Sequence, residues 1–81
     1  MALELKLPAN SAEMEYGTIV RWLKAEGDRV GQDEPVVEVE ADKVTVEIES
    51  PIAGVLTRID AAEGDEIPVG TTLALIEEDP R

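Results

Sequence analysis

The chain has 81 residues and a formal charge of −12, and it contains no cysteine and no histidine. This composition excludes disulfides, thiolate metal sites, cysteine nucleophiles and catalysis that depends on imidazole. The negative charge would repel phosphate, so we expect the chain to bind neither nucleic acid nor a membrane. Any function has to rely on very few reactive side chains.

Six short segments have the alternating or β-branched composition of strands, and turn residues such as glycine and proline separate them. In chain order they are Leu3–Leu7, Thr18–Leu23, Val36–Ala41, Val44–Glu49, Val55–Asp60 and Thr72–Glu77. None shows a helical periodicity. The pattern predicts an all-β sandwich or small barrel, and the length predicts one domain over residues 1–81.

The second half of the chain repeats the first half. Residues Gly17–Glu40 align with Gly54–Glu77 at an offset of 37 positions, which superimposes two Glu-Gly-Asp turns and several apolar positions. A unit this short cannot fold alone, so the two copies should share one core as two similar sheets related by a pseudo-twofold axis. We expect Gly27 and Gly64 to supply a positive φ at the two equivalent turns.

The repeat also predicts the position of the hairpin Val36–Glu49. Lys43 in its turn corresponds to position 80, so the gap between the chain ends replaces the turn in the second half. Strand Thr72–Glu77 should then pair with Leu3–Leu7. The Asp42-Lys43 turn should lie at the end of the domain opposite both termini.

A two-residue turn at Asp42-Lys43 fixes the register of the hairpin. The expected inward pairs are Ala41 with Val44, Val39 with Val46 and Val37 with Ile48, and the outward pairs are Glu40 with Thr45 and Glu38 with Glu47. Lysine resists a positive φ, so we expect a type I turn. Lys43 should stand at the tip, ringed by Glu38, Glu40, Asp42 and Glu47. A lysine in a turn is most often merely solvated, so its surroundings must decide its role.

An ordered set of motifs resembles a known family. The motifs are Leu7-Pro8, the Gly-Thr-Ile-Val-Arg-Trp-Leu of 17–23, the Glu-Gly-Asp of 26–28, the Glu-Ala-Asp-Lys-Val of 40–44, Pro51 and Gly54. Over the whole chain they are similar to the lipoyl domain of the dihydrolipoamide acyltransferase (E2) of 2-oxo acid dehydrogenase complexes. The resemblance implies a flattened barrel of two four-stranded antiparallel sheets. It also implies that Lys43 is amidated by lipoic acid.

By this resemblance the domain is a carrier and not an enzyme, although its parent chain would be an acyltransferase. The lipoyl group, which supplies the missing sulfur, would be acylated by an E1 decarboxylase, discharged at the E2 core and reoxidised by the E3 flavoenzyme. A lipoate ligase would attach it, with Glu40, Asp42 and Val44 as flanking recognition residues. Met14 and Tyr16 are candidate partner contacts, or else they pack on the barrel. We expect a monomeric isolated domain in a bacterial or archaeal cytoplasm.

Several alternatives remain open. A biotinyl carrier domain has the same fold and carries its modified lysine on the same hairpin. Methionine stands on both sides of that lysine, however, where this chain has Asp42 and Val44. The lipoate-carrying H-protein of glycine cleavage is longer and has helices. An unmodified β-sandwich interaction module is a third reading, and a Ca²⁺-binding domain is remote because the acidic residues lack the loop spacing. Ala41 replaces the family's usual Thr or Ser, and the motifs give conflicting indications of the 2-oxo acid.

Overall fold

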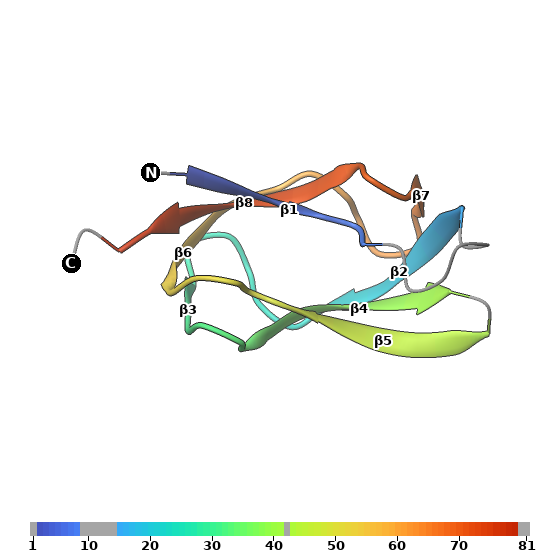
Figure 1. Ribbon diagram of the computed structural model, residues 1–81, viewed down its shortest axis with the longest axis horizontal. Coiled ribbons are helices and arrows are strands. Elements are labelled where there is room, and N and C mark those ends of the chain that lie inside the picture. The colour runs from blue at the N-terminus through green and yellow to red at the C-terminus, as the bar shows by residue number, and fades with distance from the viewer. Residues whose placement is uncertain (1, 9–14, 42, 80–81) are drawn as a thin grey trace.

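The computed structural model describes residues 2–8, 15–41 and 43–79, and Figure 1 shows two facing layers of strands. The eight strands are β1 (Ala2–Lys6), β2 (Tyr16–Trp22), β3 (Arg29–Val30), β4 (Pro35–Ala41), β5 (Val44–Glu49), β6 (Gly54–Ile59), β7 (Glu66–Pro68) and β8 (Thr72–Glu78). One sheet has the order β1-β8-β6-β3 and the other has the order β5-β4-β2-β7, with every pairing antiparallel. The all-β fold with two four-stranded sheets is confirmed.

The strand alternation predicted six of these strands to within two residues at each end. The two additional strands, β3 and β7, have only two and three residues, which is too short for any alternation to be recognised. They occupy equivalent positions, since each is the last strand of its sheet. Their pairing completes the two four-stranded sheets.

The two sheets correspond strand by strand at the offset of the sequence repeat. Strands β5, β4, β2 and β7 of one sheet match β1, β8, β6 and β3 of the other, in that order. Both β2 and β6 contain an irregularity at the same aligned position, after Ile19 and after Leu56. The pairing of β1 with β8, which replaces the β4–β5 hairpin in the second copy, agrees with the prediction.

The two Glu-Gly-Asp turns link the sheets reciprocally. Gly27 donates its backbone N–H to the Leu56 carbonyl at 2.7 Å, and Gly64 donates to the Ile19 carbonyl at 2.7 Å. Both glycines have a positive φ, 94° and 88°, as the sequence predicted. The glutamate of the first turn makes a further link between the sheets, because the Glu26 carboxylate accepts a hydrogen bond from the Ile59 N–H of β6 at 2.8 Å.

The core lies between the sheets and consists of aliphatic side chains from both copies. Equivalent positions are buried together, since Ile19 and Leu56 are at most 1% exposed and Val39 and Ile76 are fully buried. Trp22 is half-buried against this core and donates its indole N–H to the Ala61 carbonyl at 2.8 Å. Removing this much apolar surface from water is the main stabilising term for a small domain without disulfides.

Among the described residues, no helix is both long enough and apolar enough to cross a membrane. The longest dimension of the molecule is 38 Å. Along it, β1 begins and β8 ends at one extremity, and the β4–β5 turn lies at the other (Figure 1). The predicted separation of Lys43 from both ends of the chain is confirmed.

Candidate functional site

The β4–β5 hairpin has the register that a two-residue turn predicts. Ala41 opposes Val44, Val39 opposes Val46 and Val37 opposes Ile48, while the outward pairs are Glu40 with Thr45 and Glu38 with Glu47. A shift of this ladder by one residue would move every side chain of β5 to the other face, so the buried inner face fixes the register. Lys43 is consequently held at the tip, directly before β5, with its side chain exposed.

The expected type I turn is wrong. Lys43 has a φ of +66°, whereas both central residues of a type I turn have a negative φ. Positive φ values match the right-handed twist of a two-residue hairpin, and here the twist outweighs the preference of a lysine for negative φ. A side chain with a Cβ in this region costs about 1–2 kcal/mol, so the fold maintains Lys43 in an unfavourable conformation.

Lys43 differs from the other basic side chains of the described residues, because no described carboxylate forms an ion pair with it. The others each have a carboxylate nearby: Lys6 with Glu4 at 3.8 Å, Arg21 with Glu38 at 3.2 Å, Lys24 with Glu34 at 2.9 Å, Arg29 with Asp79 at 2.6 Å and Arg58 with Asp60 at 2.7 Å. No described carboxylate pairs with Lys43. In a chain with 19 acidic residues, the turn therefore presents an amine that no described neighbour engages.

The acidic surroundings of Lys43 are arranged along the outer face of its sheet. Glu38 and Glu47 lie directly opposite each other, and such a like-charge pair is destabilising. The neighbouring strand relieves part of this repulsion, because Arg21 of β2 pairs with Glu38. Glu40, nearer to the tip, is exposed between Thr45 of β5 and Thr18 of β2.

The other predicted site residues are placed as follows. Val44 was expected to face inward, and it does lie on the inner side of β5, but it is 57% exposed, whereas Ala41 opposite it is buried, because β5 is the last strand of its sheet. Tyr16 is 54% exposed at the start of β2, level with the turn by strand register. Asp42 and Met14 lie outside the described residues. Tyr16 and Val44 are two of the three large hydrophobic side chains that are exposed among the described residues, so the tip concentrates apolar surface as well as the lysine.

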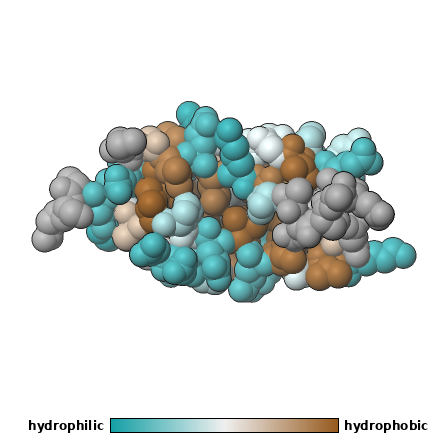
Figure 2. Space-filling model, in the orientation of Figure 1, coloured by the Kyte–Doolittle hydropathy of each residue, from teal (hydrophilic) through white to brown (hydrophobic). Residues whose placement is uncertain are grey.

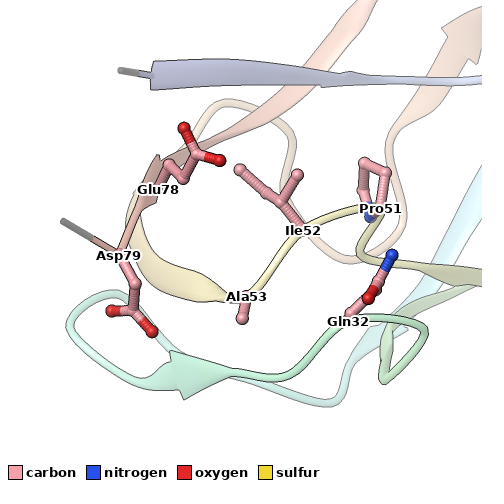
Figure 3. A pocket seen from close by; sticks show the side chains of 6 residues that line it. All are labelled: Gln32, Pro51, Ile52, Ala53, Glu78 and Asp79. Atoms are coloured by element: carbon pink, nitrogen blue, oxygen red, sulfur yellow. The ribbon is translucent and has the colours of Figure 1, made fainter. Parts of the chain in front are cut away.

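A separate hollow lies at the opposite extremity of the molecule. It encloses about 260 Å³ between Gln32, the Pro51–Ala53 segment, Glu78 and Asp79 (Figure 3). Its Asp79 carboxylate is already engaged by two hydrogen bonds from Arg29, at 2.6 and 2.7 Å. The hollow is therefore remote from Lys43 and does not form part of the site at the turn.

The comparison with known families agrees with this geometry. Residues 3–76 match the biotin/lipoyl family model, which is described as "Biotin-requiring enzyme". The chain belongs to the biotin/lipoyl domain family. The matched residues extend from β1 into β8.

Curated relatives place the chain on the lipoyl side of the biotin/lipoyl family. It is 46% identical over 76 residues to the dihydrolipoyllysine-residue acetyltransferase component of the pyruvate dehydrogenase complex of Corynebacterium glutamicum, covering 94% of this chain and 11% of that protein. Identity is 54% over 70 residues to the Mycobacterium tuberculosis component of the same kind, covering 86% and 13%. The sequence identity is 43% over 77 residues with the dihydrolipoyllysine-residue succinyltransferase component of the 2-oxoglutarate dehydrogenase complex of Bartonella vinsonii, covering 95% of this chain and 19% of that protein. The chain thus spans less than a fifth of each of these relatives.

Two solved structures have the same fold. The lipoyl domain of the 2-oxoglutarate dehydrogenase complex from Azotobacter vinelandii superimposes with a TM-score of 0.77 at 33% identity, covering 95% of this chain and 99% of that one. Urea carboxylase from Kluyveromyces lactis contains a region that superimposes with a TM-score of 0.82. That likeness, at 23% identity over 6% of the enzyme and 95% of this chain, concerns the fold alone.

Proposed function

We propose that residues 1–81 form a single lipoyl carrier domain, in which lipoic acid is attached through an amide to Nζ of Lys43. The observation that carries the proposal is the state of this lysine. It is exposed at the tip of a fixed hairpin, its backbone has a φ of +66°, and among the basic side chains of the described residues it is the one with which no described carboxylate pairs. The lipoyl domain from Azotobacter vinelandii, which the chain matches over 95% of its length, supports the choice of lipoate.

The chemistry of attachment explains why an unpaired lysine is suitable. Amide formation needs a neutral amine, because the lone pair of Nζ attacks the activated carboxyl carbon and the proton leaves. A carboxylate partner would stabilise the ammonium form and would have to be displaced first. The position of the β4–β5 turn at one extremity of the molecule favours access by a ligase (Figure 1).

The carrier role follows from what the attached group supplies, namely a redox-active disulfide at the end of a long arm, in a chain without cysteine. The protein's own part is to hold the arm on a stiff hairpin at the far end from the chain termini. Tethering raises the effective concentration of the arm at each active site that it reaches. We propose an E1 decarboxylase, an E2 acyltransferase core and an E3 dihydrolipoyl dehydrogenase as the three partners, in a cytoplasmic 2-oxo acid dehydrogenase complex.

The residues next to Lys43 receive proposed roles as well. Glu40, Asp42 and Val44 would be recognised by the modifying ligase, and Tyr16 and Met14 would contact partner enzymes. The relatives include components of both pyruvate and 2-oxoglutarate complexes, so the proposal covers 2-oxo acids as a class.

The test is the intact mass of the purified chain after incubation with lipoate ligase, lipoate and ATP. The wild type should gain one lipoyl group, and Lys43→Ala should gain none. Lys24→Ala is the matched control, because Lys24 is a lysine held in an ion pair, and it should be modified like the wild type. A parallel incubation with biotin ligase and biotin distinguishes the biotinyl reading. Absence of the lipoyl mass in the wild type, or its presence in Lys43→Ala, would refute the proposal.

A further inference from the structure

An apolar strip begins directly beside Lys43 and leads back into the core. It consists of Val44, Val46 and Ile48, which alternate along the inner side of β5 opposite Ala41, Val39 and Val37. Their exposure falls steadily, from 57% at Val44 through partly buried Val46 to 7% at Ile48. The strip is therefore an open continuation of the hydrophobic core that reaches the modified residue.

The strip is accessible because β5 is the last strand of its sheet. β1 is the last strand of the other sheet, and no pairing of described residues joins β1 to β5. Figure 2 shows hydrophobic surface running between the two layers, with hydrophilic residues above and below it. A separate hollow of about 220 Å³ is lined by Ala2, Leu3, Ile52 and Glu78. Single exposed apolar residues are common, but a graded row that opens beside the site is not scattered surface.

The arm that the proposed function places on Lys43 has the chemistry of this strip. An amide removes the positive charge of the lysine, so the arm is neutral, and its octanoyl-length chain and disulfide are apolar. Residues two apart on a strand are separated by about 6.8 Å, which is shorter than a lysine side chain extended by such an acyl group. The arm can therefore cover Val44 and Val46 without any change in the hairpin.

The opposite face of the hairpin offers the arm much less. It carries Glu38, Glu40 and Glu47, whose carboxylates prefer water to an uncharged chain. Tyr16 lies on that acidic side, two residues before Thr18, which pairs with Glu40. Burial of apolar surface consequently favours the inner strip, and the covalent tether makes the contact intramolecular.

We propose that Val44 and Val46 form a docking strip for the lipoyl arm of this same chain, which rests there between visits to partner enzymes. This inference rests on the proposed function. In the docked state the disulfide is partly shielded from solutes, and a partner that accepts the arm has to displace it from Val44. Val44 is thus a positioning residue for the arm.

The test uses the complete 81-residue chain after lipoylation, with the modification verified by intact mass. Nuclear Overhauser effects should connect protons of the acyl chain and dithiolane ring with the methyl groups of Val44 and Val46. If the fully lipoylated chain shows no such effects, or shows them to the Tyr16 ring instead, the strip is not the docking site. Failure to gain the lipoyl mass would instead refute the proposed function, so the two failures are distinguishable.

A second measurement is the rate at which a water-soluble phosphine reduces the lipoyl disulfide. Threonine has nearly the shape of valine but is polar, so Val44→Thr should weaken docking while keeping the strand. If the arm is docked about half of the time, its release raises the reduction rate about twofold. Val20→Thr is the matched control, because Val20 is also exposed, at 43%, but lies on β2. Equal rates in the wild type and both variants would overturn the proposal, and if Val44→Thr does not fold, the Overhauser effects in the wild type decide.

Discussion

Gly54 lies where the backbone of β6 passes close to that of β8, and its replacement by alanine tests the packing of the β1-β8-β6-β3 sheet. A Cβ at Gly54 would stand 2.1 Å from the Glu77 carbonyl oxygen and 2.9 Å from its carbonyl carbon, both of them backbone atoms of β8. Ordinary contacts begin at 3.4 Å, so the two strands would have to separate by more than an ångström. β8 is paired with β1 on its other side and cannot move alone.

The repeat provides two comparisons for Gly54→Ala. Gly17 is its equivalent, but a Cβ there would meet the Val39 Cγ1 at 2.6 Å, and a side chain can yield where backbone cannot. Gly31 has open space, with the Glu34 Oε1 at 3.7 Å as the nearest atom. We expect Gly54→Ala to lose about 3 kcal/mol or more, Gly17→Ala about 1–3 kcal/mol, and Gly31→Ala to be neutral or stabilised by up to about 1 kcal/mol.

Urea unfolding followed by Trp22 fluorescence measures these differences, because Trp22 is half-buried and its indole is hydrogen-bonded to Ala61. A chain of this length has a stability of about 4–12 kcal/mol, so Gly54→Ala should lower the melting temperature by roughly 12–24 °C or leave the chain unfolded. The reasoning fails if Gly54→Ala and Gly31→Ala unfold at the same urea concentration, or if Gly17→Ala is the more damaging of the equivalent pair.

Three further outcomes are expected from the same unfolding assay. Lys43→Gly should stabilise the chain by about 0.5–1 kcal/mol, because glycine accepts the φ of +66° without strain. If Lys43→Gly unfolds at the same urea concentration as Lys43→Ala, or at a lower one, the backbone of Lys43 is not strained. Glu26→Ala should lower the stability by about 1 kcal/mol, and by more than Glu63→Ala does. The Glu26 carboxylate accepts from the backbone N–H of Ile59 at 2.8 Å, whereas that of Glu63 accepts from the backbone N–H of Trp22 at the longer distance of 3.3 Å; equal losses would argue against that ranking. The backbone N–H of Gly31, and to a lesser extent the Lys24 side chain, lower the pKa of the Glu34 carboxyl below its ordinary value of 4.5. The stabilisation that ionised Glu34 gives the fold is therefore present above pH 4.5 and is lost as the pH falls through the lower pKa of the folded state. The stability difference between wild type and Glu34→Gln should therefore shrink on acidification, and a difference that is constant down to about pH 3 would be inconsistent with it.

The architecture could be predicted from the sequence because each half of the repeat predicts the strand arrangement of the other half. Alternation located the long strands, the offset of 37 matched β5 with β1, and the two-residue turn determined which side chains of β4 and β5 oppose each other. The short strands β3 and β7 could not be recognised, since two or three residues hold no periodicity. Their pairing depends on backbone groups that the folded turns bring together.

The details of the candidate site were less accessible to the sequence. The φ of Lys43 results from the twist of the hairpin, which overrides the preference of an isolated lysine. The exposure of Val44 depends on the position of β5 as the last strand of its sheet, which a face assignment does not reveal. That no described carboxylate pairs with Lys43 becomes informative only when the partners of the other basic residues are known. Arg21 and Glu38, for example, lie on neighbouring strands and not next to each other in the sequence.

The pairing of β1 with β8 places the first and last strands side by side, with Ala2 directly opposite Glu77. Antiparallel partners are separated by about 5 Å, close to the width of an ordinary surface loop at its base. The fold can therefore be spliced into a loop of an unrelated host without stretching either polypeptide. In such a fusion the Lys43 turn would lie at the far end of a domain 38 Å long, away from the surface of the host protein.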